Sequence, residues 1–344
     1  MLGTGGGGDP HLGALLAKQA IREKGPVQLV AVADVPDDAL VVATAGMGAP
    51  TVGVEKLPRG DEHIRALQAL QRYLERPITH TVAIEAGGSN STVPLRVGAQ
   101  LRIPVVDADG MGRAFPEIQM VMPTLYGISA TPMALADDKG NVAVIHTVDN
   151  YWAERLSRSL TIDMGCVAEI ALYPLSGHQL KQAMIAGTIS LAEHLGRLIH
   201  QARAAHDDPI AAIVHRLNGY RVFDGKITDV ARRTETGFTK GQTRIESLDR
   251  NAASLLTVHF QNEYLVAVQD GQTVASVPDL IIILDAETGE PITTEGLRYG
   301  FRVTVIAAPC DIRWRTSQGL ALVGPRSFGH DFDYIPIEQR FARP

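Results

Sequence analysis

The densest group of chemically capable side chains lies in PVVDADGMGRAFPEIQM, residues 104–120. An apolar run, typical of a buried strand, leads directly into Asp107 and Asp109, and Arg113 and Glu117 follow a glycine turn. Three acids and an arginine within eleven residues at a strand end suit metal coordination or acid/base chemistry. The structural alternative is a solvated turn in which Arg113 pairs with an acid. A divalent metal such as zinc, held by these acids and His11, is a candidate cofactor, although no spacing specifies it.

A second loop, AIEAGGSNS at 83–91, follows a predicted strand and places Glu85 and Asn90 beside Gly87 and Gly88. In open α/β sheets, ligands bind beyond the carboxyl ends of the strands. The alternative is a turn followed by a serine helix cap. The residues alone leave both readings open.

A third loop, GTGGGGDPH at 3–11, directly precedes a predicted helix. Glycines let the backbone approach a ligand, and a helix N-terminus offers unpaired N–H groups to anions or polarised oxygens. The run also fits the dinucleotide spacing GxGxxG, with Asp34 near the position of a ribose-binding acid, but no strand precedes it. A tight turn is the alternative. The backbone entropy cost of so many glycines favours a ligand loop, with candidate binding residues Gly5, Gly6, Gly7, Gly8 and Asp9.

The other polar groups are better explained structurally. Cys310 lacks an evident histidine partner, so a buried, inert thiol is the better interpretation, and Cys166 is typical of a core residue. The segment at 324–338 either folds back to close the site or, as we favour, finishes the β region; it carries Gly324, Pro325, Arg326, His330, Asp331 and Asp333. The histidines of the helix predicted at 178–205 are expected to be solvated or to lie in the core: His178, His194 and His200. No GxSxG, P-loop or HExxH motif is present.

The elements that position these loops alternate between strand and helix patterns in the first half of the chain. We expect strands at 27–35, 39–48, 81–86, 104–110 and 142–148, and helices at 12–24, 61–76, 93–101 and 178–205, the last broken near Gly187. This alternation favours parallel strands with crossover helices. Beyond residue 207, short β runs separated by Gly, Asn and Asp predict a mostly β module. The predicted fold is therefore an α/β domain with a largely parallel sheet at 1–207 and a mostly β, swivelling-type domain at 208–344.

Composition narrows the function classes. The 344 residues carry a net charge of −6 and no dense basic cluster, which argues against nucleic acid or an anionic membrane as a partner. Two cysteines exclude a disulfide framework and a cysteine-based zinc site. No run of 18 apolar residues and no signal peptide pattern is present, so we expect a cytoplasmic protein that acts on a small molecule as a homo-oligomer.

Four segments together resemble the S-methyl thiohydantoin desulfurase family, a former domain of unknown function found near hydantoinase/oxoprolinase proteins. They are GTGGGGDPH, AIEAGGSNS, VVDADGMGRAFPEIQM and GLALVGPRSFGHDFDYIPIE, and the likeness runs from Gly3 to Glu338. Family members usually have a further segment before the glycine loop, which here begins at residue 3. The resemblance implies an α/β domain followed by a mostly β domain. It also implies hydrolytic removal of sulfur from C2 of a thiohydantoin-like ring, in the breakdown of sulfur-bearing imidazoles such as ergothioneine.

The residues carried over by position are Gly5 to Gly8, Asp9, Glu85, Asn90, Asp107, Asp109, Arg113 and Glu117. In this hypothesis Asp107 or Asp109 activates water, directly or through a metal, and Glu85 donates a proton. The glycine-loop N–H groups and Arg113 hold the ring carbonyl or a substrate carboxylate. Replacing Asp109 with asparagine should then reduce turnover by orders of magnitude with folding intact. Two alternatives remain: a nicotinamide-dependent oxidoreductase, and a non-catalytic ligand-binding or assembly subunit of a hydantoinase-like system.

Overall fold

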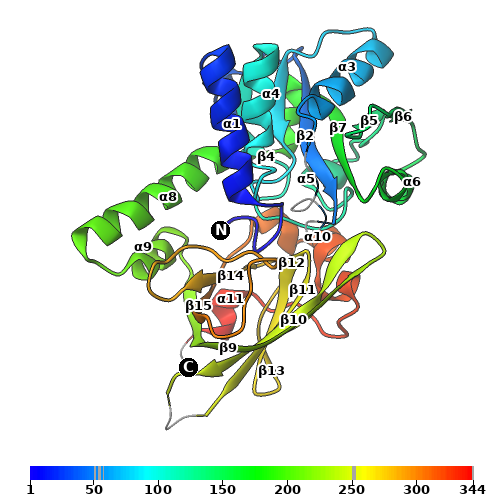
Figure 1. Ribbon diagram of the computed structural model, residues 1–344. Helices are drawn as coiled ribbons and strands as arrows, with labels where there is room; N and C mark the ends of the chain where they lie inside the picture. Colours follow the sequence, from blue (N-terminus) through cyan, green and yellow to red (C-terminus); the bar gives the residue numbers. More distant parts are fainter. Residues whose placement is uncertain (50–51, 53–55, 57, 250–252, 343–344) are drawn as a thin grey trace. The chain divides into compact units, whose positions relative to one another are not determined.

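The computed structural model describes residues 1–49, 52, 56, 58–249 and 253–342. The chain folds into two compact units, which we describe separately (Figure 1). The N-terminal unit comprises Gly7–Ser190 and Thr236–Phe238, and the C-terminal unit comprises Met1–Gly6, Leu191–Glu235 and Thr239–Pro344. Helix α8 (Thr188–Ala205) passes from the first unit to the second at Ser190 and Leu191, whereas the boundary at residue 207 stays a prediction.

The N-terminal unit is built on a mixed sheet, which confirms the predicted α/β domain. Among the described residues, eight strands form it in the order β1-β4-β3-β2-β7-β5-β6, with β8 paired to β4. The pairs β1–β4, β3–β4 and β2–β3 are parallel, and β2–β7, β5–β7, β5–β6 and β4–β8 are antiparallel. The strands are β1 (Leu29–Val30), β2 (Leu40–Gly48), β3 (His80–Ala83), β4 (Val105–Asp109), β5 (Met133–Ala136), β6 (Val142–Ile145), β7 (Val167–Ser176) and β8 (Ile185–Ala186).

The helices of this unit form where the sequence combines an apolar stripe with a start signal. Pro10 opens α1, and Asp149 caps α6 by accepting the Trp152 N–H at 2.8 Å. The helices are α1 (Pro10–Lys24), α3 (Glu62–Leu74), α4 (Val93–Leu101), α5 (Met122–Leu125), α6 (Asn150–Asp163) and α7 (Gly177–Ala183). Helices α3 and α4 pack on one face of the sheet, where Leu67 and Val97 join Val42 in a buried cluster, and α1 lies beside α4 (Figure 1).

One predicted strand is wrong. The run at 27–35 forms only the two-residue strand β1 and a 3-10 helix at Val32–Asp34, and Leu29 is 43% exposed. Because β1 lies at the edge of the sheet, it has one neighbour and is not buried on both faces. The predicted break near Gly187 is confirmed, since α7 ends at Ala183 and α8 begins at Thr188.

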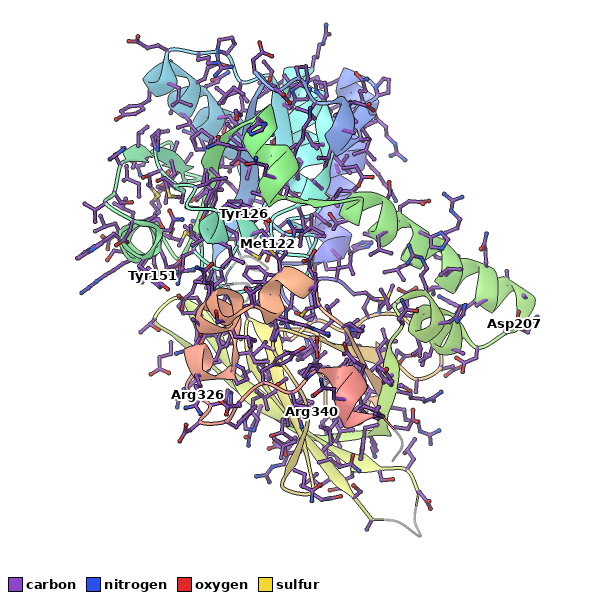
Figure 2. All side chains as sticks on the ribbon, turned by 180° about the vertical axis from the view of Figure 1, so that it is seen from behind. Met122, Tyr126, Tyr151, Asp207, Arg326 and Arg340 are labelled. Carbon is purple, nitrogen blue, oxygen red and sulfur yellow. The ribbon has the colours of Figure 1, made fainter. Side chains whose placement is uncertain are left out.

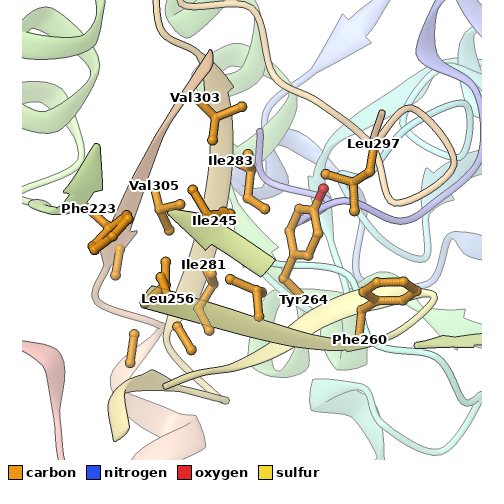
Figure 3. Close-up of a cluster of buried hydrophobic side chains, with 14 of the residues drawn as sticks. Phe223, Ile245, Leu256, Phe260, Tyr264, Ile281, Ile283, Leu297, Val303 and Val305 are labelled. Atoms are coloured by element: carbon orange, nitrogen blue, oxygen red, sulfur yellow. The ribbon is translucent and has the colours of Figure 1, made fainter. Parts of the chain in front are cut away.

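The C-terminal unit carries an antiparallel, curled sheet, as the turn-rich pattern predicted. Among the described residues, seven strands follow the order β13-β12-β11-β10-β9-β15-β14. They are β9 (Tyr220–Glu235), β10 (Phe238–Ser247), β11 (Leu255–Gln261), β12 (Glu263–Gln269), β13 (Gln272–Ser276), β14 (Leu280–Asp285) and β15 (Arg302–Ala308). Alternate residues face inward and form one apolar core around Ile245, Tyr264 and Ile283 (Figure 3). The helices here are α9 (Pro209–Arg216), α10 (Ser317–Val323) and α11 (Ile337–Arg340).

Buried Asp279 anchors the end of the chain to this sheet. Its carboxylate accepts hydrogen bonds from Tyr334 Oη at 2.9 Å, the Ile337 N–H at 2.8 Å and the Cys310 N–H at 3.0 Å, and Arg315 pairs with it at 3.0 Å. Within 324–338, exposed Arg326 (Figure 2) pairs with two nearby acids, Asp331 and Asp333. These contacts support a structural role for the segment within its own unit.

The two cysteines and the three histidines of the predicted 178–205 helix lie in different environments. Burial raises the pKa of the Cys310 thiol to about 12, so this group is protonated and a poor nucleophile, as predicted. Cys166 does not lie in the core; it is partly exposed in the turn between α6 and β7, where its φ is 65°. His178, His194 and His200 are all exposed. None of the described helices has the length and apolar character needed to cross a membrane.

Candidate functional site

Two carboxylates meet at the carboxyl ends of parallel strands β3 and β4. Ala83, the last residue of β3, is paired in register with Asp109, the last residue of β4, and Glu85 follows two residues after Ala83. The two loops are tied together, since the Ala86 N–H donates to Asp109 Oδ2 at 2.9 Å and the Gly110 N–H donates to the Ile84 carbonyl at 2.9 Å. Parallel pairing thus brings two acids that are far apart in the sequence into one buried site.

Asp109 is the centre of a small amide cage. Its carboxylate accepts the N–H groups of Ala86, Met111 at 3.2 Å and Gly112 at 2.9 Å, and the side chain is completely buried. Burial raises the pKa of Asp109 to about 6, and the donated backbone hydrogen bonds act in the opposite direction. At neutral pH this carboxylate is mostly ionised and holds the loop by its charge.

The pKa of Glu85 is raised further than that of Asp109. It is 5% exposed, and burial, reinforced by the negative charge of Asp109, raises its pKa to about 7. Asn90 donates from Nδ2 to Glu85 Oε1 at 2.7 Å while its own Oδ1 accepts the Gly46 N–H at 2.8 Å. The amide therefore fixes the position of the acid, and Glu85 holds a proton for a large fraction of the time near pH 7.

This perturbed acid makes the stability of the protein depend on pH. Folding raises the Glu85 pKa from 4.5 to about 7, so its contribution to stability is complete below pH 4.5 and is lost as pH rises through about 7. The loss is about 3 kcal/mol for a shift of this size. We expect the free energy of unfolding of Glu85→Gln, measured in urea, to exceed that of the wild type increasingly from about pH 4.5 to about pH 8. A difference that stays constant over this range would contradict the assigned environment.

Arg113 and Glu117 lie in the loop that follows Asp109. Arg113 is fully buried, donates from Nε to the Ala114 carbonyl at 3.0 Å and stacks 4.8 Å from the centre of the Phe115 ring. Its charge acts on Glu85 and lowers the pKa of that acid, although less than burial raises it. Glu117 is half-buried and accepts a hydrogen bond from Gln119. Of Arg113 and Glu117, it is therefore Arg113 whose charge affects the pKa of Glu85.

Two residues that the sequence reasoning missed hold this loop in place. Glu154 of α6 accepts the Ile118 N–H at 2.9 Å and pairs with Arg158 at 2.7 Å, and Arg158 donates to the Pro116 carbonyl at 3.1 Å. Their i, i+4 spacing was the only local signal, and it is typical of an exposed helix pair. Both side chains are instead buried against the loop.

The glycine run belongs to both units. Gly5 and Gly6 lie in the C-terminal unit, where an added Cβ would meet Tyr264 and Glu263, respectively. Gly7 and Gly8 lie in the N-terminal unit and pack against the second loop. The Asn90 N–H donates to the Gly7 carbonyl at 3.1 Å, and Ser89 Oγ donates to it at 3.2 Å. The need for glycine is strictest at Gly7, where an added Cβ would meet the backbone of Gly87, whereas at Gly6 it would meet the side chain of Glu263.

Gly7→Ala tests this close approach. A Cβ at position 7 would lie 2.5 Å from the Gly87 carbonyl carbon, and φ there is +84°. We expect thermal unfolding at clearly lower temperature than for Gly127→Ala, the matched control, whose φ is +69° but which has no atom within 4 Å of its Cβ position. The control isolates the cost of positive φ, roughly 1 kcal/mol, from the clash between backbones. Equal losses of stability in the two variants would show that the loops do not need this contact.

The remaining candidates are placed apart from the carboxylate pair. Asp9 caps α1 by accepting the N–H groups of His11 and Leu12, and His11 is exposed on that helix. The side chain of Asp107 in β4 accepts the N–H groups of Ile189 and Ser190 in the first turn of α8, each at 3.0 Å. Within the part of the chain that the structure describes, no group of three or more His, Cys, Asp or Glu side chains could hold a metal ion. The divalent metal suggested at His11, Asp107 and Asp109 stays a prediction.

Comparison with known proteins places the chain in a family. The model of the S-Me-THD-like N-terminal domain matches residues 1–147, and that of the S-Me-THD-like C-terminal domain matches residues 148–337. No curated protein matches. A protein from Chromobacterium violaceum with a known X-ray crystal structure is 24% identical, with a TM-score of 0.79 over 98% of this chain and 95% of that chain, which supports the fold. The chain belongs to the S-Me-THD-like family, the family of S-methyl thiohydantoin desulfurase that its four segments predicted.

Proposed function

We propose that this protein is a hydrolase that removes sulfur from C2 of a thiohydantoin-like ring, with S-methyl thiohydantoin as the substrate to test first. The observation that carries the proposal is the buried pair Glu85 and Asp109 at adjacent strand ends, one of which retains a proton near neutral pH. Membership of the S-Me-THD-like family supports the choice of ring and leaving group. A thioimidate carbon needs both an acid and a base in order to react with water.

Glu85 is the proton donor in this proposal. Water adds to C2 while a carboxylate of the site takes one of its protons, and protonated Glu85 transfers its own proton to the ring nitrogen. The tetrahedral intermediate then carries a hydroxyl and the methylthio group on C2. As the hydroxyl proton returns to Glu85 and the carbonyl forms, the C–S bond breaks and methanethiol leaves with the proton first taken from water. Both carboxylates end in their starting states.

Asp109 and Arg113 adjust the pKa of Glu85 for this proton exchange. The charge of Asp109 helps to keep Glu85 protonated, and Arg113 is close enough to oppose this effect. Their combined action keeps the Glu85 pKa near the pH of the reaction, where a general acid is most effective. In the proposal, Arg113 and the amides of the glycine loop also bind the ring carbonyl or a substrate carboxylate.

The cofactor and partner predictions remain open. The chain's own groups carry every proton transfer above. Of the side chains suggested for a divalent metal, Asp107 accepts N–H groups of α8, Asp109 lies in the amide cage, and His11 is exposed. Homo-oligomer formation and association with hydantoinase or oxoprolinase proteins stay predictions.

The direct test is methanethiol release from S-methyl thiohydantoin by purified protein, with sulfide release from thiohydantoin measured in parallel. Elemental analysis and assays with and without a chelator accompany it. We expect catalytic release that does not depend on added metal. Metal in stoichiometric amount with chelator-sensitive release would replace the direct acid/base mechanism, and absence of release would favour a ligand-binding or assembly subunit.

A further inference from the structure

A second buried acid–base pair lies in the N-terminal unit beside the carboxylates. His63 of α3 and Glu169 of β7 approach each other with 2.7 Å between Nε2 and Oε2. The histidine side chain is 3% exposed, whereas that of Glu169 is 17% exposed. His63 is therefore the buried member of the pair, and Glu169 is the partly accessible member. This is the arrangement expected when a buried histidine orients a carboxylate that faces a site.

Strand pairing places Glu169 next to Asn90. Glu169 is in register with Gly46 of β2, and a Cβ on Gly46 would lie 3.1 Å from Glu169 Oε2 and 3.7 Å from Asn90 Oδ1. Both side chains thus border the same small space, which glycine leaves open. Asn90 then donates to Glu85 at 2.7 Å. Glu169 and Asn90 thus approach the same point beside Gly46 of β2, and Asn90 connects that point to Glu85.

Asp109 and Glu169 differ in how their carboxylate oxygens are hydrogen-bonded. Asp109 accepts backbone N–H groups on both oxygens, so its lone pairs are engaged in holding the loop. Glu169 Oε2 is buried and makes no hydrogen bond to any described residue, although His63 Nε2 lies 2.7 Å from it. His63 Nδ1 is likewise buried without a partner among these residues. Buried polar atoms are nearly always paired, so such exceptions point to a functional group.

We propose that Glu169 is the carboxylate that takes the proton from the attacking water, and that His63 is its positioning residue. This assignment rests on the proposed hydrolase function and completes it. Glu169 accepts the proton as the C–O bond forms at C2 and returns it to sulfur as the C–S bond breaks, while Glu85 exchanges its proton with the ring nitrogen and the hydroxyl. His63 acts through Glu169 and does not contact the substrate.

The alternative is an ion pair that only ties α3 to β7. An isosteric variant distinguishes the catalytic role from this structural role. Glu169→Gln keeps the size of the side chain, but glutamine cannot take a proton. We expect kcat for methanethiol release to fall roughly 100-fold or more, with KM and the Kd for hydantoin from calorimetry unchanged. His63→Leu should lower kcat on the order of 10-fold, and His63→Gln, which keeps a polar group opposite Glu169, should restore most of it.

The double variant His63→Leu/Glu169→Gln should be no slower than Glu169→Gln alone, since His63 acts through Glu169. Glu62→Gln is the control for stability; Glu62 is buried beside His63 and accepts the Gly60 N–H at 2.8 Å, and its kcat should stay at the wild-type value. Wild-type kcat in Glu169→Gln, or losses that multiply in the double variant, would overturn the assignment. If the wild type itself releases no methanethiol, the proposed function fails and the assignment fails with it.

Discussion

Replacing Glu85 with glutamine is expected to lower kcat for methanethiol release by about 10²- to 10⁴-fold while the protein stays folded. Glutamine keeps the oxygen that accepts the Asn90 amide at 2.7 Å, so the geometry of the loop is retained. What is lost is the exchangeable proton. Because a neutral amide also avoids the cost of burying a charge, thermal unfolding at pH 7.5 should occur at the wild-type temperature or above it.

The pH dependence of kcat/KM provides a control for this prediction. Wild-type kcat/KM should fall as pH rises through about 7, where Glu85 loses its proton, and this limb should be absent from the residual activity of Glu85→Gln. Glu62→Gln again serves as the matched buried variant. Turnover in Glu85→Gln close to that of the wild type would remove Glu85 from the mechanism, whatever the stability of the variant.

Asp109→Asn is expected to lower both turnover and stability. The sequence alone predicted lost turnover with folding intact, but the amide cage changes that expectation. Asparagine offers one acceptor oxygen where the carboxylate offers two, and its amide group would face the N–H groups of Ala86, Met111 and Gly112. We expect a loss of about 3 kcal/mol in the free energy of unfolding, because buried donors are left without acceptors.

Turnover should fall as well, because the variant removes the negative charge that helps Glu85 to keep its proton. In the remaining activity, the alkaline limb of the kcat/KM profile should therefore move to lower pH. Asp137→Asn is a close control: Asp137 is 1% exposed and accepts the N–H groups of Lys139, Gly140 and Asn141 in a turn away from the site. An Asp109 variant that loses stability like this control, yet keeps wild-type kcat and pH profile, would make Asp109 purely structural.

The two predictions divide the acids into a proton carrier and an electrostatic support. Asp109 accepts three backbone N–H groups, whereas Glu85 accepts the side-chain amide of Asn90 at 2.7 Å and a backbone hydrogen bond from Phe115.

Much of the fold could be predicted from local sequence patterns. Local periodicity was enough for the helices at α3 and α4, for strand β2 and for the two-part fold, and strand-end composition singled out Glu85, Asp107 and Asp109 as candidates, whose roles stay predictions. These signals are local because amphipathic spacing and turn residues act over a few positions. The short strand β1 shows the limit, since an apolar run does not reveal how many neighbours a strand will have.

The contacts that the candidate residues make depend on the tertiary structure. Asp107 and Asp109 are both strand-end acids in the sequence, yet Asp107 accepts an N–H of α8, whereas Asp109 accepts one from the loop after β3. His63 and Glu169 carried no motif, and they meet because α3 packs on the sheet where β7 pairs with β2. Such contacts depend on strand order and register between distant segments, which no local pattern of residues encodes.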